Sequence, residues 1–480
     1  DDDGVAELVG HRARFRRVAS DAAFGLHQTE PLDQGLEAVA VLGQVDGVGR
    51  GAENGHLGGF EPGREFQRRL PAELDDDAEQ FALRLLDARD FQRFGDRLSA
   101  ETALACGWLR DGRMSQEGFA IGFELEAWLL DHGSFPHPVN ERFLHTLNHP
   151  LVVPELSRFN VELNCTPQPL GGFALRHAET ELTELWAQCN AVAHGLDANM
   201  VMIGTLPTIR EQDLTLANMS PLKRYYALNN EVLRRRGGRP LRIEIDGREH
   251  LSIEHSDVML EAATTSFQVH LKTPARLAQH YFNASLIASG PILAASGNAP
   301  FLFGKTLWEE TRIPLFEQAV SFAGMHAGEE RVTFGHGYLA SPAQWLEENL
   351  RKFPVLLPLC FEEPAQALRH VRLHNGTIWR WNRPLLGFEE NGSAHIRIEH
   401  RILPAGPSFI DMMANAALYI GLAHYLVALD PACAELDFDA ARANFYAAAR
   451  DGLSAQIQWP RVGRLRADTL MMEELLPAAR

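Results

Sequence analysis

The sequence has few cysteines, and no two of them form a metal-binding or redox pair. Its 480 residues include five cysteines, which lie far apart and without a Cys-x-x-Cys spacing. This pattern excludes a disulfide-rich scaffold and a zinc ribbon, and it fits a reducing compartment. The five are Cys106, Cys165, Cys189, Cys360 and Cys433. We expect them to be small core residues of a cytoplasmic protein rather than nucleophiles.

Positive charge is also scarce, because 45 Lys and Arg stand against 63 Asp and Glu, a formal net charge of −18. A nucleic-acid or anionic-membrane binder needs a basic face, so we expect neither kind of partner. Two stretches without charged residues, 277–304 and 412–429, are long enough to be mistaken for membrane spans. Both contain Asn and His, so we expect buried core helices of a soluble domain. The composition leaves open whether copies of the chain form a homo-oligomer.

Residues 1–113 lack Lys, Met, Ile and Tyr altogether. Within them, only 75–98 spaces its apolar residues like one face of a helix. Two interpretations of 1–113 remain open: a disordered or accessory arm, or a non-native upstream extension whose true start is Met114. We therefore place all chemistry in one domain over residues 114–480. We expect a chain that starts at Met114 to keep full activity.

From Met114 onwards, helix-like segments alternate with short strand-like ones. The helical candidates are 174–198, 221–236, 274–296, 342–350, 408–429, 440–453 and 467–476. The segment Gly297–Thr306 resembles a phosphate-binding P-loop only superficially, because Ala299 stands where that motif requires glycine. Any nucleotide site must therefore be built in another way.

Five strand-like segments place apolar side chains on one face and selected polar side chains on the other, since alternate residues of a strand share a face. The segments are Phe119–Leu130, Phe159–Cys165, Thr265–Lys272, Gly376–Arg383 and His395–Leu403. Their polar faces carry Glu124, Glu126, Asn160, Glu162, Asn164, Gln268, His270, Lys272, Arg380, Asn382, Arg397, Glu399 and Arg401. Each segment alone also fits a half-exposed antiparallel strand that turns its charges to water.

The choice of polar residues favours a site for metal ions and phosphate over a solvated surface. Glutamates are ligands of hard metal ions, and arginines suit phosphate. Clustered carboxylates repel each other unless cations neutralise them, and Mg²⁺ is usually held by a few carboxylates plus substrate phosphates. Phosphoryl transfer needs such metal ions and arginines that stabilise spread negative charge. The pattern predicts an ATP-using enzyme without a P-loop, on a concave polar sheet face that is backed by helices.

At these residues the sequence resembles the glutamate–cysteine ligase type 2 family, which comprises carboxylate–amine ligases with a glutamine-synthetase-like fold. The motifs that carry the resemblance are Gly122–Glu126, Phe159–Asn164, Met202–Thr208, Phe267–His270, His374–Pro384 and Arg397–Pro407. They cover most of 114–480 and leave 1–113 outside. The resemblance implies an α+β fold with a large antiparallel sheet, helices packed on one face and a polar active-site funnel on the other.

The resemblance also implies a reaction and roles for single residues. ATP would phosphorylate a carboxylate, and an amine would then attack the acyl phosphate, giving an amide, ADP and phosphate. The implied ligands of Mg²⁺, or of Mn²⁺ in its place, are Glu124, Glu126, Glu162, Glu399 and His270. His270 would contact either a metal or an ATP phosphate. Arg401 and Arg397 would stabilise the transferring phosphoryl group, and the implied substrate-binding residues are Arg312, Arg380 and Asn164.

The implied small-molecule substrates are amino acids and ATP, with glutamate and cysteine giving γ-glutamylcysteine for glutathione biosynthesis. The motifs do not identify the amine. A ligase for another acid or amine, a kinase that stops at a phosphorylated product, and a non-catalytic nucleotide- or metal-binding regulatory protein on the same fold remain open. Because an acyl phosphate hydrolyses in water, we also expect a covering loop. The candidate is Glu231–Asp257, with its basic run Arg234–Arg239.

Overall fold

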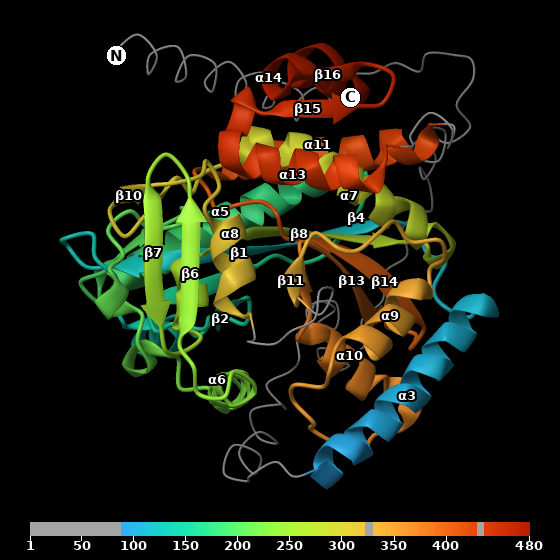
Figure 1. The fold of residues 1–480 in the computed structure, drawn as a ribbon, viewed down its shortest axis with the longest axis horizontal. Helices are drawn as coiled ribbons and strands as arrows, with labels where there is room; N and C mark the ends of the chain where they lie inside the picture. Colours follow the sequence, from blue (N-terminus) through green and yellow to red (C-terminus); the bar gives the residue numbers. More distant parts are fainter. Residues whose placement is uncertain (1–87, 322–329, 430–435) are drawn as a thin grey trace, which may run out of the picture.

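The computed structural model describes residues 88–321, 330–429 and 436–480 (Figure 1). At its centre lies an eight-stranded sheet in the order β13-β14-β8-β1-β3-β2, with β4 and β5 also paired to β1. All of these pairings are antiparallel. The strands are β1 (Ala120–Leu130), β2 (Val152–Pro154), β3 (Asn160–Asn164), β4 (Gln168–Pro169), β5 (Asn199–Val201), β8 (Phe267–Thr273), β13 (Asn382–Phe388) and β14 (Ala394–His400). The predicted large antiparallel sheet is confirmed.

The register of the sheet brings the polar residues of four strands into rows. Residues two apart on a strand lie about 7 Å apart on the same face, so successive rows are separated by that distance. The cross-strand pairs are Lys272 with Arg397, His270 with Glu399, Gln268 with Glu124, Asn164 with Glu124, and Glu162 with Glu126. One face of the sheet therefore carries a continuous polar strip, as the period of two predicts.

Helices cover the opposite, apolar face of the sheet (Figure 1). The central one, α7, packs on β13 and β14 and also contacts its neighbours α11 and α13, while α5 packs on β1 and β3. Their bounds are α5 (Ala174–His194), α7 (Ala278–Ser296), α11 (Phe409–Ala428) and α13 (Phe438–Asp451). The α+β class with helices on one face is thus as expected.

Both uncharged stretches of the sequence form helices that are mostly buried, α7 and α11. Inside α7, the hydroxyls of Ser285 and Ser289 donate to the carbonyls four residues earlier, each at 2.7 Å, so the helix buries them without an unpaired hydroxyl. Among the described residues, only α11 is long and apolar enough to cross a membrane, and 67% of its most apolar window is buried in the protein. That degree of burial is typical of a core helix.

A helix from the compositionally biased N-terminal region packs against the rest of the protein. This helix, α3 (Ala88–Arg110), contacts α9 (Gln344–Lys352) and α10 (Arg369–Gly376). Its residues Phe94 and Leu98 are buried, and residues 75–87 of the predicted helical segment lie outside the described residues. The domain boundary at 113 stays a prediction. Of the interpretations left open for 1–113, a disordered arm is wrong for residues 88–110, because they form a helix.

The predicted covering loop Glu231–Asp257 is wrong, because the segment is regular structure. It contains the end of α6 (Lys223–Arg235) and a hairpin of β6 (Leu241–Asp246) and β7 (His250–His255) that packs on α8 (Arg312–Ala319). Arg234 and Arg235 pair with Glu231 inside α6, each at 2.7 Å. The smaller elements are α4 (Asn140–Leu147), β9 (Phe301–Leu302), β10 (Lys305–Thr306), β11 (Val332–Thr333), β12 (Trp379–Arg380), β15 (Gln456–Trp459), β16 (Gly463–Arg466) and α14 (Ala467–Leu470).

Candidate active site

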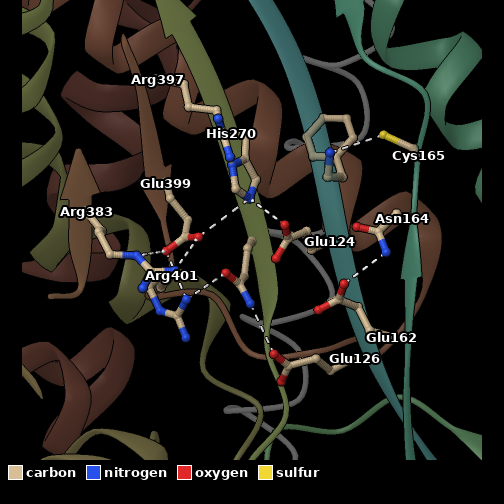
Figure 2. A network of polar contacts seen from close by, with 12 residues as sticks. Glu124, Glu126, Glu162, Asn164, Cys165, His270, Arg383, Arg397, Glu399 and Arg401 are labelled. Carbon is tan, nitrogen blue, oxygen red and sulfur yellow. Dashed lines mark hydrogen bonds and ion pairs between the residues drawn. The ribbon is translucent and has the colours of Figure 1, made fainter. Parts of the chain in front are cut away.

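The polar strip of the sheet contains two groups of side chains whose ligand atoms lie within 4.8 Å of one another. We call the first the carboxylate cluster, which consists of Glu126, Glu155 and Glu162. The second is the histidine cluster, which consists of Glu124, His270 and Glu399. Figure 2 shows Glu126 and Glu162 of the first cluster beside the three residues of the second, on neighbouring strands. The strip therefore gathers every carboxylate that the sequence predicted as a metal ligand, and it adds Glu155.

The carboxylate cluster brings three carboxylates together; Glu162 is buried, and Glu126 and Glu155 are partly buried. Glu126 accepts hydrogen bonds from the backbone N–H of Ser266 at 2.7 Å and from the side-chain amide of Gln268 at 3.0 Å. Burial, followed by the charge of Glu155, still raises the pKa of Glu126 to about 7. A divalent cation would relieve the repulsion between these carboxylates, and carboxylate oxygens are the ligands that Mg²⁺ prefers. The cluster thus fits the ion that the sequence implies.

The histidine cluster is organised around one imidazole. The Nε2 atom of His270 lies 3.2 Å from Glu124 and 3.9 Å from Glu399. Its Nδ1 atom accepts a hydrogen bond from Nε of Arg397 at 3.2 Å. A neutral imidazole that accepts at Nδ1 carries its proton on Nε2. In this arrangement Nε2 of His270 would carry a proton but forms no hydrogen bond among the described residues, so it is a donor still available to a ligand, which suits a contact to phosphate better than one to metal.

Glu399 is held by two arginines. Arg383 binds both of its oxygens, at 2.8 and 2.9 Å, and Arg401 binds one at 2.9 Å. Burial opposes the ionisation of Glu399, but Arg383, Arg401 and His270 outweigh it and hold its pKa well below the usual range. Arg401 also donates to the carbonyl of Gln268 at 3.0 Å, and the amide of Gln268 donates to Glu126. This single glutamine therefore links the two clusters.

A cavity opens beside the carboxylate cluster. Its lining includes Glu126, Glu155, Asn160, Glu261, Arg312, Phe316, Trp381 and Arg401. The indole N–H of Trp381 donates to Glu317 at 2.8 Å, and its ring meets that of Phe316 edge to face, so this wall is fixed. A partly enclosed cavity with acidic, basic and aromatic walls can hold a small polar substrate and keep water from a reactive intermediate.

Arg312 and Asn164, two of the predicted substrate-binding residues, lie in or near the site. Arg312 lines the cavity, although its Nε is bound to Glu310 at 2.6 Å and its Nη2 to the carbonyl of Ile402 at 2.5 Å. Asn164 donates to Glu162 at 2.9 Å. The amide of Asn164 therefore orients a candidate metal ligand.

Arg380, the third predicted substrate-binding residue, is directed elsewhere. It donates to Asn349 at 2.9 Å and lies 3.4 Å from Glu348, both on α9. The predicted strand Gly376–Arg383 is in fact two strands, since β12 ends at Arg380 and β13 begins at Asn382. The break turns Arg383, rather than Arg380, toward Glu399. No contact in the described part of the chain brings Arg380 to the two clusters.

Sequence reasoning missed Arg383, Glu155 and Glu261. A signal for Arg383 exists, because Asn391-Gly392 is a typical hairpin turn, and folding the chain there sets Arg383 opposite Glu399. Glu155 follows the short strand β2, and Glu261 lies in a 3₁₀ helix, Met259–Ala263. Neither position belongs to an alternating pattern, so only the three-dimensional structure reveals them.

The family model of glutamate-cysteine ligase family 2 matches residues 120–480. No curated protein matches the sequence. The matched region includes both clusters and the cavity, and it begins after α3.

Three solved structures are distantly similar. A glutamate–cysteine ligase from Francisella tularensis in complex with AMP is 13% identical, with a TM-score of 0.47, over 76% of this chain and 79% of that one. A bifunctional glutathione synthetase from Pasteurella multocida is 9% identical, with a TM-score of 0.40, over 81% of this chain and 47% of that one. A glutamine synthetase from Plasmodium falciparum is 11% identical, with a TM-score of 0.29, over 69% of this chain and 55% of that one. The chain thus spans about half the length of the last two.

Proposed function

The chain belongs to glutamate-cysteine ligase family 2, and on that premise we propose that it is an ATP-dependent ligase that joins a carboxylate to an amine. The proposed acid is glutamate, reacting through its γ-carboxylate, and cysteine is the first amine to test. ATP would phosphorylate the carboxylate, because oxide is too poor a leaving group for an amine to displace directly. The amine would then displace phosphate and form the amide.

The observation that carries this proposal is the adjacency of the two clusters, joined through Gln268, with the cavity at one end. Phosphoryl transfer requires metal ions and cations that stabilise charge spreading over the phosphate oxygens. The carboxylate cluster would hold Mg²⁺, which would supply positive charge for phosphoryl transfer when bound. Arg401 is well placed to stabilise the transferring group, because Glu399 and Gln268 fix its guanidinium.

The order of the rows along the sheet supports an orientation for the substrates. Lys272 and Arg397 are cross-strand partners one row beyond His270, at the end of β8 that lies away from the cavity. Two cations opposite each other on one face are favourable only beside anions, and here Lys272 pairs with Glu389 at 2.8 Å. With Lys272 already paired, we place the phosphate chain of ATP beside His270 and Arg397, away from the cavity. The acid and the amine would then meet in the cavity.

The test is the release of ADP from MgATP with L-glutamate, with and without L-cysteine, followed by a panel of other amines. Release that depends on glutamate and rises with cysteine, together with a γ-glutamyl product identified by mass, would establish the ligase. Release that rises only with another amine would keep the reaction and change the substrate. Tight nucleotide binding without release for any acid–amine pair would contradict the proposal and favour a regulatory protein.

A further inference from the structure

A network of buried polar groups lies between the sheet and the helices, on the side away from the two clusters. His400 of β14 and Asn382 of β13 are cross-strand partners, and both are fully buried. Their side chains point to the helices, because their neighbours Glu399 and Arg383 meet on the polar face. Nδ1 of His400 lies 2.7 Å from Oδ1 of Asn382, and the amide of Asn382 donates to the hydroxyl of Ser289 on α7 at 2.9 Å. The network thus ties two strands to a helix.

The hydrogen bonds of this network have only one consistent direction. The hydroxyl of Ser289 donates its single proton to the carbonyl of Ser285 at 2.7 Å, so it can only accept from Asn382. The amide nitrogen of Asn382 therefore faces Ser289, and its oxygen faces His400. Because that oxygen only accepts, the proton of His400 lies on Nδ1. Burial lowers the pKa of His400 to about 3, in agreement with a neutral ring that donates to Asn382.

The imidazole of His400 is held by stacking as well as by this bond. Its ring is parallel to that of Tyr419, with 3.9 Å between the centroids, and the hydroxyl of Tyr419 lies 2.8 Å from that of Ser285. Nε2 of His400 is buried and has no hydrogen-bond partner in the part of the chain that the structure describes. An unpaired buried acceptor costs stability, so an apolar ring would pack here at lower cost. What the histidine adds is the bond to Asn382.

The pair of Asn382 and His400 lies directly behind an ion pair of the active site. In the register of the two strands, Asn382 is opposite His400 and Arg383 is opposite Glu399. The two pairs are therefore consecutive, one on each face of the sheet. They stand where β13 begins, after the break at Trp381. The position of Arg383 thus depends on how the first residue of β13 is held.

The apolar residues of these strands do not by themselves fix that position. The other residues that β13 and β14 turn to the helices are apolar, so a shift of β13 by two residues would keep all of them on their face. The same shift would place Arg383 opposite Arg397 or Arg401. Asn382 and His400 oppose it, because each would lose its buried partner. The polar pair therefore selects the register that the active site needs.

We propose that Asn382 and His400 are positioning residues of the active site, which hold Arg383 opposite Glu399 from the helix side of the sheet and so orient Arg401 for phosphoryl transfer. The inference rests on the proposed ligase function. Arg383 binds both oxygens of Glu399, at 2.8 and 2.9 Å, and Arg401 binds the same carboxylate at 2.9 Å. A small displacement of β13 would release this carboxylate, and Arg401 would lose the partner that orients it.

The experiment compares variants that weaken the same buried layer in different ways. H400F keeps a planar ring against Tyr419 and removes the donor to Asn382. H400N keeps a donor near the position of Nδ1 and removes the ring. Y419F removes the hydroxyl that bonds to Ser285 and keeps the stacked ring, so it is the matched control.

Activity is measured with the acid and amine that give the fastest ADP release. We expect kcat to fall about 10- to 100-fold in H400F, the loss that a misplaced catalytic group causes, while the KM values for acid and amine stay within about threefold. H400N should recover part of this kcat. Y419F should keep the original kcat, although its melting temperature falls about as far as that of H400F.

A double-mutant cycle tests whether the pair acts through Arg383. R383M removes the ion pair to Glu399, so H400F should lower kcat little further in that background. A second readout needs no substrate. In ¹⁵N spectra of the arginine-labelled protein, the Nε–H signal of Arg383, assigned with R383M, should move in H400F and stay in place in Y419F.

Several outcomes would overturn the inference. An unchanged kcat in folded H400F would do so, and equal losses in H400F and Y419F would show only a general loosening of the helix layer. Additive losses in H400F and R383M would mean that His400 does not act through Arg383. If H400F is insoluble, S289A, which removes the acceptor of the Asn382 amide, is compared with Y419F in the same way. If the unmodified protein forms no amide with any pair, the ligase proposal fails separately, and the arginine spectrum still decides whether His400 positions Arg383.

Discussion

Arg397 donates a hydrogen bond from Nε to Nδ1 of His270, at 3.2 Å, and thereby sets the protonation pattern of the histidine cluster. With Nδ1 occupied as an acceptor, the proton of a neutral imidazole lies on Nε2, which faces Glu124 at 3.2 Å. A metal ion bound at Nε2 would need the opposite tautomer, and Arg397 would have to move away.

The first prediction follows from this pair. In ¹⁵N spectra of the histidine-labelled protein, His270 should be protonated at Nε2 both before and after Mg²⁺ is added, because we expect it to contact phosphate. H270Q provides the assignment of the signal. R397Q removes the donor and should allow a mixture of tautomers. A switch to Nδ1 protonation on addition of Mg²⁺ alone would instead identify His270 as a metal ligand.

The second prediction concerns α3 and reverses the expectation for a chain that starts at Met114. Glu101 of α3 accepts hydrogen bonds from the backbone N–H groups of His370 and Val371 at 2.8 and 3.0 Å, and it meets Nδ1 of His370 at 2.5 Å. It thus caps the first turn of α10, and removing it would leave buried donors unpaired, at a cost of about 1–3 kcal/mol.

We therefore expect a chain of residues 88–480 to melt like the full-length protein, and one of 114–480 to be less stable or insoluble. Differential scanning calorimetry and ADP release measure both. E101Q should lower the melting temperature, whereas D96N, which changes an exposed residue of the same helix, should not. Equal stability of the two truncated chains would show that α3 is dispensable.

The third prediction concerns Glu155, a candidate ligand that sequence reasoning missed. If it holds Mg²⁺ together with Glu126 and Glu162, E155Q should weaken the binding of Mg²⁺ or Mn²⁺ roughly tenfold or more, as the loss of a metal-site contact generally does. Calorimetric titration of the metal ion without nucleotide measures this directly. E211Q, an exposed glutamate elsewhere, is the control. Unchanged affinity in E155Q would remove Glu155 from the site.

The fourth prediction concerns pH and Glu317, which accepts hydrogen bonds from Trp381 and Tyr446, both at 2.8 Å. Burial raises its pKa from 4.5 to about 7. Between these values the folded protein binds more protons than the unfolded chain, so this group's contribution to stability falls as the pH rises. The size of the effect is at most about 3 kcal/mol.

E317Q cannot ionise and should lose that dependence. Relative to the unmodified protein, its melting temperature should therefore rise between pH 5 and pH 8. E473Q, at an exposed position, should show no such change. A difference between E317Q and the unmodified protein that stays constant with pH would mean that Glu317 is ionised throughout.

The alternation of polar and apolar residues was enough to predict the strands that build the site. Glu124, Glu126, Glu162, His270 and Glu399 were all found in this way, because strands impose a period of two on side chains whatever their partners are. Alternation fails where a strand breaks, and a break at Trp381 separated Arg380 from the site and brought in Arg383 instead.

Residues outside regular strands could not be predicted in this way. Glu155 and Glu261 reach the cavity from a loop and a 3₁₀ helix, whose positions depend on long-range packing. The contact between Glu101 and His370 joins residues 269 positions apart in the sequence, and no local pattern signals it. The expected covering loop failed for the opposite reason, since its basic run suggested mobility while Glu231 pairs two of the arginines locally.

The antiparallel register of β8 on β1 determines how a misfolded chain could be detected. A slip of one residue would turn His270 and Gln268 toward the helices and bring Val269 to the polar face. No chain with this slip could assemble the histidine cluster or link it to Glu126, even if its overall shape and helix content were preserved. Binding of metal or nucleotide would therefore serve as a quality test for recombinant preparations, sensitive to misfolding that circular dichroism cannot detect.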